Sequence, residues 1–190
     1  MDDNTRLGIY IFVANLPILI FGLLIKLFWP GFSDSNFRSL FSIAIISIIM
    51  SLLLALSEIY GKRKKLFSDI KIKDIILLGI SQSLALFPGV SRSGVTLTSA
   101  LFSGIERKTA ARLSFLVGIP AISIAGIVEL FNLCRTSSTL DIFPIFIGII
   151  SSFFSSIFSI NYLLRFLAKN NTFIFVIYRM AFGLFILSNL

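Results

Sequence analysis

Residues 86–96, LFPGVSRSGVT, separate two apolar runs and contain the residues best suited to bind an anion. The turn-forming and polar residues of this segment are Pro88, Gly89, Ser91, Arg92, Ser93, Gly94 and Thr96. Hydroxyl groups and main-chain amides at the start of a helix, together with the fork of an arginine, suit a phosphate or a carboxylate. An arginine at membrane depth is costly and is therefore taken as functional by default. The segment predicts an anion site.

Two other interpretations of these residues stay open. Arg92 could pair with Glu58 or Glu129 and simply hold helices together, although a strut of this kind would not need the surrounding glycines and hydroxyl groups. Gln82, about two helical turns before the break, could add its amide to the same cavity. It could equally form a hydrogen bond between helices.

The composition indicates the class of protein that must position this segment. The chain has 190 residues, is 56% hydrophobic and contains 21 Phe, which is too apolar for a soluble domain and indicates a multispanning, all-α membrane protein. Its net charge of +8 comes from basic residues in loops between apolar runs, which predicts membrane orientation and not nucleic-acid binding. Histidine is absent and there is one cysteine, so imidazole chemistry and cysteine clusters are excluded for this sequence.

Apolar runs predict five membrane spans and one re-entrant segment. The expected spans are Leu7–Phe28, Ser39–Tyr60, Ala110–Phe131, Asp141–Phe166 and Thr172–Leu190. Residues 74–103 contain two apolar halves, each shorter than the ~20 residues that a span needs, and predict a helix-loop-helix that returns to its own side. With that topology most basic residues, including the loop 61–73, gather on one face, and the C-terminus lies outside.

The motif and its surroundings resemble a known family. QSLALFPGVSRSGVT, followed by ERKTAARLSFLVGIPA, resembles the second signature region of the undecaprenyl-diphosphatases of the bacitracin-resistance type. RLGIYIFVANLPILIFGLL, ALSEIYGKRKK and FIFVIYRMAFGL fall in matching order, so the likeness extends over essentially the whole chain. The resemblance implies an enzyme of the bacterial cytoplasmic membrane that hydrolyses undecaprenyl diphosphate for reuse of the peptidoglycan lipid carrier and confers bacitracin resistance.

The resemblance also implies an architecture and roles for particular residues. Members consist of two inverted repeats, each with a re-entrant pair. We therefore expect residues 1–60 to be two spans of a first repeat, 61–73 a basic cytoplasmic loop, and 74–190 a second repeat in one membrane domain. Matching the motif assigns catalysis to Ser91 and Arg92, with substrate-binding roles expected for Ser93, Thr96, Gln82 and Gly94.

The family's first signature would lie upstream of the region that Arg6 matches. It carries an ExxxE pair and a serine-rich loop with histidine, and the resemblance implies Mg²⁺ or Ca²⁺ bound by those glutamates, so we expect these ligands to be absent from this chain. A late start site or partial chain is the favoured explanation; a decayed frame and a half-protein completed by a second polypeptide are the others. We expect little activity from the chain alone, and polyprenyl-phosphate binding or transport is the alternative function. A homo-oligomer stays open.

Overall fold

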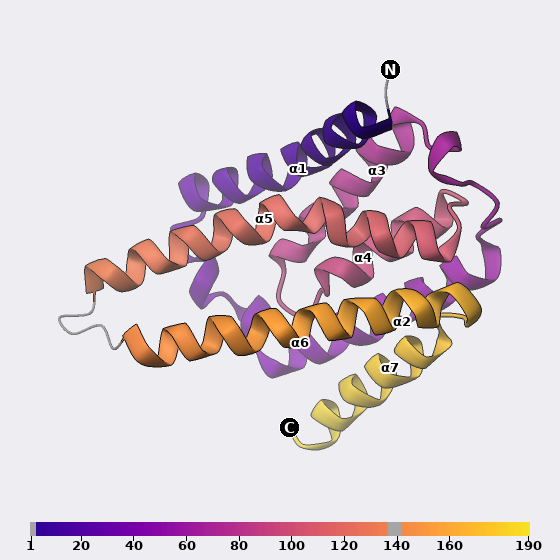
Figure 1. Ribbon diagram of the computed structural model, residues 1–190. Coiled ribbons are helices and arrows are strands. Elements are labelled where there is room, and N and C mark those ends of the chain that lie inside the picture. The colour runs from indigo at the N-terminus through magenta and orange to yellow at the C-terminus, as the bar shows by residue number, and fades with distance from the viewer. Residues whose placement is uncertain (1–2, 137–141) are drawn as a thin grey trace.

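The structure is a computed structural model that describes residues 3–136 and 142–190, and helices dominate it (Figure 1). The α-helices are α1 (Asp3–Phe28), α2 (Leu40–Tyr60), α3 (Ile72–Ser83), α4 (Arg92–Phe102), α5 (Arg107–Thr136), α6 (Ile142–Lys169) and α7 (Phe173–Ser188). Short 3₁₀ turns are η1 (Pro30–Asp34), η2 (Asn36–Arg38), η3 (Phe67–Asp69) and η4 (Leu84–Leu86). The described ranges contain no strand, only an isolated bridge between Lys65 and Ile105. The all-α prediction is confirmed.

Four helices of the described part are long and apolar enough to cross a membrane. They comprise Asp3–Phe28, Leu40–Tyr60, Arg107–Leu133 and Phe143–Lys169, in good agreement with the first four predicted spans. The fifth predicted span corresponds to α7, an apolar helix of 16 residues. At 1.5 Å per residue it is about 24 Å long, somewhat less than a typical hydrocarbon core of about 30 Å. The chain is a multi-pass membrane protein.

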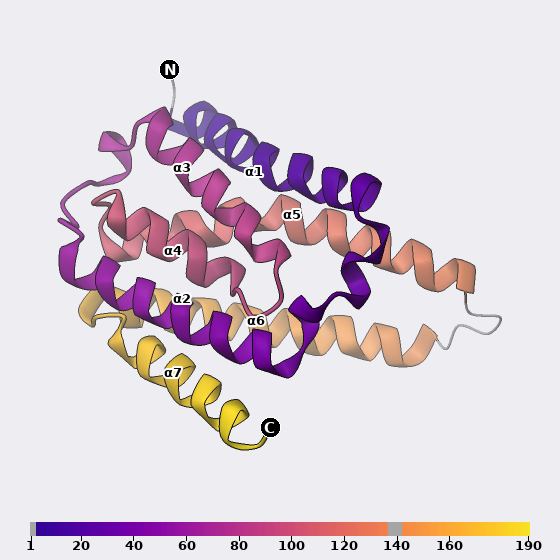
Figure 2. The same ribbon diagram turned by 180° about the vertical axis from the view of Figure 1, so that it is seen from behind.

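Helices α3 and α4 form the helix-loop-helix that the sequence predicts. They have 12 and 11 residues, or about 16–18 Å each, roughly half of a hydrocarbon core. The chain leaves the pair where it entered, because Lys65 donates its amide to the carbonyl of Gly104 (2.9 Å) and accepts from the amide of Glu106 (3.0 Å). Figures 1 and 2 show the turn between the helices about halfway along α5.

The break between these helices lies earlier in the chain than the sequence suggests. Turn-forming and polar residues continue through Gly94, but α4 already begins at Arg92, because Ser91 serves as its N-cap and accepts a hydrogen bond from the Gly94 amide at 3.1 Å. Pro88 does not mark the end of the incoming helix. Instead α3 ends at Ser83, a 3₁₀ turn follows, and Phe87, the residue before the proline, is already extended. Arg92, Ser93 and Gly94 therefore lie in the first turn of a helix that Ser91 caps.

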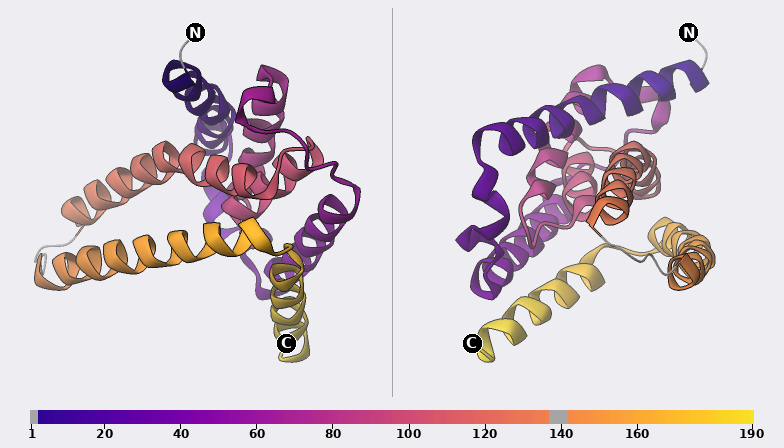
Figure 3. Two further views of the ribbon diagram at one scale, coloured as in Figure 1. Left: turned by 45° about the vertical axis from the view of Figure 1, so that its right-hand side comes forward. Right: turned by 90° about the vertical axis from the view of Figure 1, so that its left-hand side faces the viewer.

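The helices pack in two groups on either side of α4. On one side α1 lies against α3 and α5, and α1 approaches α3 so closely that a Cβ on Gly79 would lie 2.7 Å from the carbonyl oxygen of Ala14. On the other side α2 pairs with α7, as the two views of Figure 3 show. Helix α6 packs along α5 and leaves most of its surface exposed. The division into two repeats stays a prediction.

Candidate functional site

The first turn of α4 presents hydroxyl groups beside free main-chain amides. Ser91 caps the helix, and its Oγ lies 3.4 Å from Oγ of Ser93. The first amides of an α-helix have no partner within the helix, and the helix dipole favours negative charge at this end. Ser91, Ser93 and Gly94 all line one cavity, so the structure brings three of the predicted residues together.

A second arginine, which the sequence analysis did not single out, completes the polar part of this cavity. Arg179 of α7 extends to the turn before α4 and donates from Nη2 to the carbonyl oxygen of Gly89 at 2.7 Å. Its guanidinium also passes close to Gly94, where an added Cβ would lie 2.9 Å from Nη1. The signal was present in the sequence, since Arg179 is a charged residue inside the apolar run FIFVIYRMAFGL.

Arg92 lies on a different side of α4 and does not line the cavity. Its guanidinium rests on the backbone of α5 at Gly118, where a Cβ would lie 1.7 Å from Nη1 of Arg92. This Nη1 atom is buried and has no hydrogen-bond partner. Within the described residues Arg92 forms no salt bridge, and Glu58 pairs with Arg63 and Arg107 instead, so the strut interpretation through Glu58 is wrong. Arg92 therefore keeps at least one guanidinium donor without a protein partner, on the α5 side of the helix terminus.

Thr96 and Gln82 also lie away from the cavity lining. Thr96 is fully buried against α5, where its Oγ1 lies 2.5 Å from Oγ of Ser114. Gln82 is fully buried and donates from Nε2 to Oδ1 of Asn15 at 3.2 Å, as the interpretation of a hydrogen bond between helices predicts. Asn15 in turn donates to the carbonyl of Val117 at 2.9 Å. Direct substrate contacts by Thr96 and Gln82 are therefore not supported by this geometry.

Ser114 is a further polar residue of the site that the sequence did not reveal. It belongs to α5, lines the cavity, and donates from Oγ to the carbonyl oxygen of Ser93 at 3.2 Å. Nothing in the local sequence distinguishes it from the other serines of the apolar runs, because its role depends on how α5 packs against α4.

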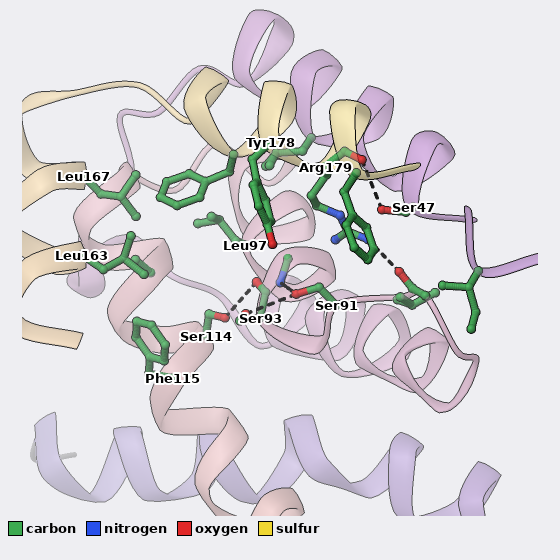
Figure 4. Close-up of a pocket in the computed structure, with 18 residues that line it drawn as sticks. Ser47, Ser91, Ser93, Leu97, Ser114, Phe115, Leu163, Leu167, Tyr178 and Arg179 are labelled. Atoms are coloured by element: carbon green, nitrogen blue, oxygen red, sulfur yellow. Dashed lines mark hydrogen bonds between the residues drawn. The ribbon is translucent and has the colours of Figure 1, made fainter. Parts of the chain in front are cut away.

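The cavity has one polar region and long apolar walls. Its volume is about 490 Å³, and it lies among α2, α4, α5, α6 and α7. Figure 4 shows Ser91, Ser93 and Arg179 on one side, while Leu163, Leu167 and Phe115 lie on the other. The apolar lining consists mainly of leucine and phenylalanine side chains: Leu54, Leu97, Phe115, Leu163, Leu167, Phe175 and Phe182. An amphiphile with an anionic head and a hydrocarbon tail fits both regions at once.

The donor set of the described residues does not fit a divalent metal. Mg²⁺ and Ca²⁺ prefer several oxygen ligands, usually with carboxylates among them. The cavity lining has no Asp or Glu, and residues 3–136 and 142–190 contain no group of three or more His, Cys, Asp or Glu that could hold an ion. The Mg²⁺ or Ca²⁺ requirement stays a prediction from the resemblance.

These features define a class: a multi-pass helical membrane protein with a candidate anion site at the start of a half-length helix, next to an apolar cavity. The family model described as bacitracin resistance protein BacA matches residues 1–185, and the chain belongs to this family. It is 75% identical over 189 residues to an undecaprenyl-diphosphatase of Prochlorococcus marinus strain NATL1A, with all of this chain and 68% of the relative covered.

More distant relatives carry the same name. The chain is 49% identical over 187 residues to the undecaprenyl-diphosphatase of Prochlorococcus marinus strain MIT 9313, which covers 98% of this chain and 62% of the relative. The chain is 48% identical over 187 residues to the undecaprenyl-diphosphatase of Synechococcus sp. strain WH7803, and the match covers 98% of this chain and 65% of the relative. The chain thus spans about two thirds of the length of these relatives.

Proposed function

We propose that this chain takes part in the hydrolysis of undecaprenyl diphosphate to undecaprenyl phosphate and inorganic phosphate. The observation that carries the proposal is the cavity, which joins the first turn of α4 and Arg179 to walls of leucine and phenylalanine. A polyprenyl diphosphate has the matching chemistry, with an anionic head and an apolar chain. The names of the relatives support the same substrate.

The residues of the site would bind and orient the diphosphate. Amides of the first turn of α4 and the hydroxyl groups of Ser91 and Ser93 donate to phosphoryl oxygens, and Arg179 offsets their negative charge. Arg92, on the α5 side of the same turn, brings a second guanidinium to the helix terminus. Phosphoryl transfer depends largely on positioning and charge stabilisation, which are the contributions that these groups can make.

The setting of the reaction is part of the proposal. We place the chain in the bacterial cytoplasmic membrane, in recycling of the peptidoglycan lipid carrier, with bacitracin resistance as the phenotype. The matched family's description and the apolar helices support this placement. Membrane lipids surround the chain in this setting. We also propose that the chain can associate with itself into a homo-oligomer, and a size measurement in detergent would test this.

Binding or transport of a polyprenyl phosphate without cleavage is the second candidate. It is favoured by the lining of the cavity, which offers hydroxyl groups and an arginine but neither a carboxylate nor an imidazole. The decisive experiment measures both binding of undecaprenyl diphosphate and phosphate release by the purified chain in detergent, with Mg²⁺ or Ca²⁺ added. Turnover supports the enzyme, binding with little or no release supports the second candidate, and failure to bind contradicts both.

A further inference from the structure

A buried carboxylate lies at the opposite end of α7 from the C-terminus, outside the cavity lining. Glu58, in the last turn of α2, is only 2% exposed. Its Oε1 accepts from Nη1 of Arg63 at 2.5 Å and from Nε of Arg107 at 2.9 Å, with a second short contact from Nη2 of Arg107. Its Oε2 accepts from Oγ1 of Thr172 at 2.7 Å and from the Thr172 amide at 3.3 Å. The Glu58 side chain thus links the end of α2 to three other places: Arg63 in the following loop, Arg107 at the start of α5 and Thr172 just before α7.

The position of Glu58 is unfavourable for α2 and favourable for α7. A carboxylate in the last turn of α2 meets the negative end of that helix's dipole, which opposes it. Thr172 is the residue just before α7, where the positive end of the dipole and free amides favour a carboxylate. Arg63 has a left-handed backbone (φ 50°), a conformation that is strained for arginine and is retained where its surroundings hold it. This arrangement anchors the start of α7.

Helix α7 transmits this anchor to the cavity. Arg179 follows Thr172 by seven residues, or about two turns, so both lie on nearly the same face of α7. Along this face α7 packs tightly on α2, because a Cβ on Gly183 would lie 2.7 Å from Cγ1 of Ile48. A shift of α7 along its axis would therefore move Arg179 away from the Gly89 carbonyl.

We propose that Glu58 is a positioning residue. Through Thr172 it fixes the position of α7 along its axis and the rotation of α7 about that axis, and it thereby holds Arg179 against the turn before α4. The functional consequence rests on the proposed binding of a diphosphate by Arg179. The anchoring of α7 does not depend on that function and can be measured separately.

The test compares Glu58→Gln and Thr172→Val with the matched control Asp74→Asn. Asp74 is also a buried carboxylate, 6% exposed, and it binds Lys65 at 3.0 Å, but it contacts neither α7 nor the cavity. Thr172→Val removes only the hydroxyl and keeps the shape of the side chain, so it probes the anchor even where Glu58→Gln folds poorly. Thr172→Ser keeps the hydroxyl, so its amide exchange and its lipid affinity should match those of the wild type.

Two measurements on the purified chain separate anchoring from function. Amide hydrogen exchange over residues 172–180 reports the anchor without any ligand, and we expect it to rise at least about tenfold in both variants and not in the control. Affinity for undecaprenyl diphosphate reports the function, and we expect it to fall roughly threefold to tenfold. In an Arg179→Ala background, Thr172→Val should cause no further loss, because its effect acts through Arg179.

The outcomes are distinguishable. Unchanged exchange over residues 172–180 would refute the anchor. Raised exchange with unchanged affinity, or additive losses in the Arg179→Ala background, would refute the positioning role. If the wild-type chain binds no undecaprenyl diphosphate, the proposed function fails, while the exchange data still decide whether Glu58 anchors α7.

Discussion

At the scale of single residues, two guanidinium groups lie near the start of α4, one carried by α7 and one by the first residue of α4 itself. Arg179 reaches it from α7 inside the cavity, and Arg92 reaches α5 at Gly118. Arg92 was predictable because it lies within a compact motif of hydroxyl groups and glycines. Arg179 gave only the signal of a lone charge in an apolar run, because its contact with the site depends on the packing of α7 against α2 and on the distant carbonyl of Gly89.

Substituting Gly118 tests the placement of Arg92. In Gly118→Ala the new Cβ would overlap the guanidinium, since it would lie 1.7 Å from Nη1, so Arg92 must move. We expect affinity for undecaprenyl diphosphate to fall about tenfold and stability to fall by about 1–3 kcal/mol, as for other overpacked positions. Gly126→Ala is the control in the same helix, because nothing lies within 4 Å of its added Cβ. Equal binding by the two variants would show that Arg92 takes no part in recognition.

Exchanging each arginine for lysine tests whether the fork geometry is used. Lysine keeps the charge but loses the paired donors of the guanidinium, so Arg92→Lys and Arg179→Lys should each weaken binding of the diphosphate lipid by about tenfold or more. Binding of the monophosphate, with its smaller charge, should weaken less. Arg135→Lys, at the far end of α5 with its guanidinium 4.4 Å from the ring of Phe131, should bind normally. An unchanged affinity of Arg92→Lys for the diphosphate lipid would show that binding does not use the paired donors of the Arg92 guanidinium.

At the scale of elements, the N-cap of α4 links the stability of a helix to the site. Ser91→Ala removes the hydrogen bond from the Gly94 amide and should destabilise the chain by about 1 kcal/mol. It should also weaken diphosphate binding, because Ser91 lines the cavity. Ser39→Ala is the matched control, since Ser39 caps α2 by accepting from the Ser42 amide at 3.2 Å, away from the cavity. Thermal unfolding should show similar losses for both variants, and loss of binding by both would contradict a specific role for Ser91.

The helices themselves follow closely from the sequence, while their termini and contacts do not. Apolar run lengths predict α1, α2, α5 and α6 well, and the two short runs predict the α3–α4 pair. The start of α4 is earlier than the sequence suggests. Gly94, the third residue of α4, resembles part of a break in the sequence, because the hydrogen bond from its amide to the N-cap Ser91 is visible only in the structure. Thr96 and Gln82 were assigned to the site from proximity in sequence, yet both are buried in contacts between helices.

At the scale of the whole molecule, the return of the α3–α4 pair decides on which side of the membrane every later segment lies. The backbone contacts of Lys65 with Gly104 and Glu106 place both ends of the pair together. In a bilayer, Lys64 and Lys108 should then face the same compartment, and Asn189 at the end of α7 the opposite one. From the positive-inside rule we expect this arrangement to gather the basic loop 61–73 and the start of α5 on the cytoplasmic face.

Thiol labelling in spheroplasts measures this topology directly. In a Cys134→Ser background, we expect Asn189→Cys to react with a membrane-impermeant maleimide, and Lys64→Cys and Lys108→Cys to react only after permeabilisation. All three positions are exposed, so lack of reaction in intact spheroplasts reports the compartment and not burial. Labelling of Lys64→Cys and Lys108→Cys from opposite sides would show that residues 74–103 cross the membrane. That result would refute the return of α3 and α4 to one side, and with it the side of the membrane assigned here to α5, α6 and α7.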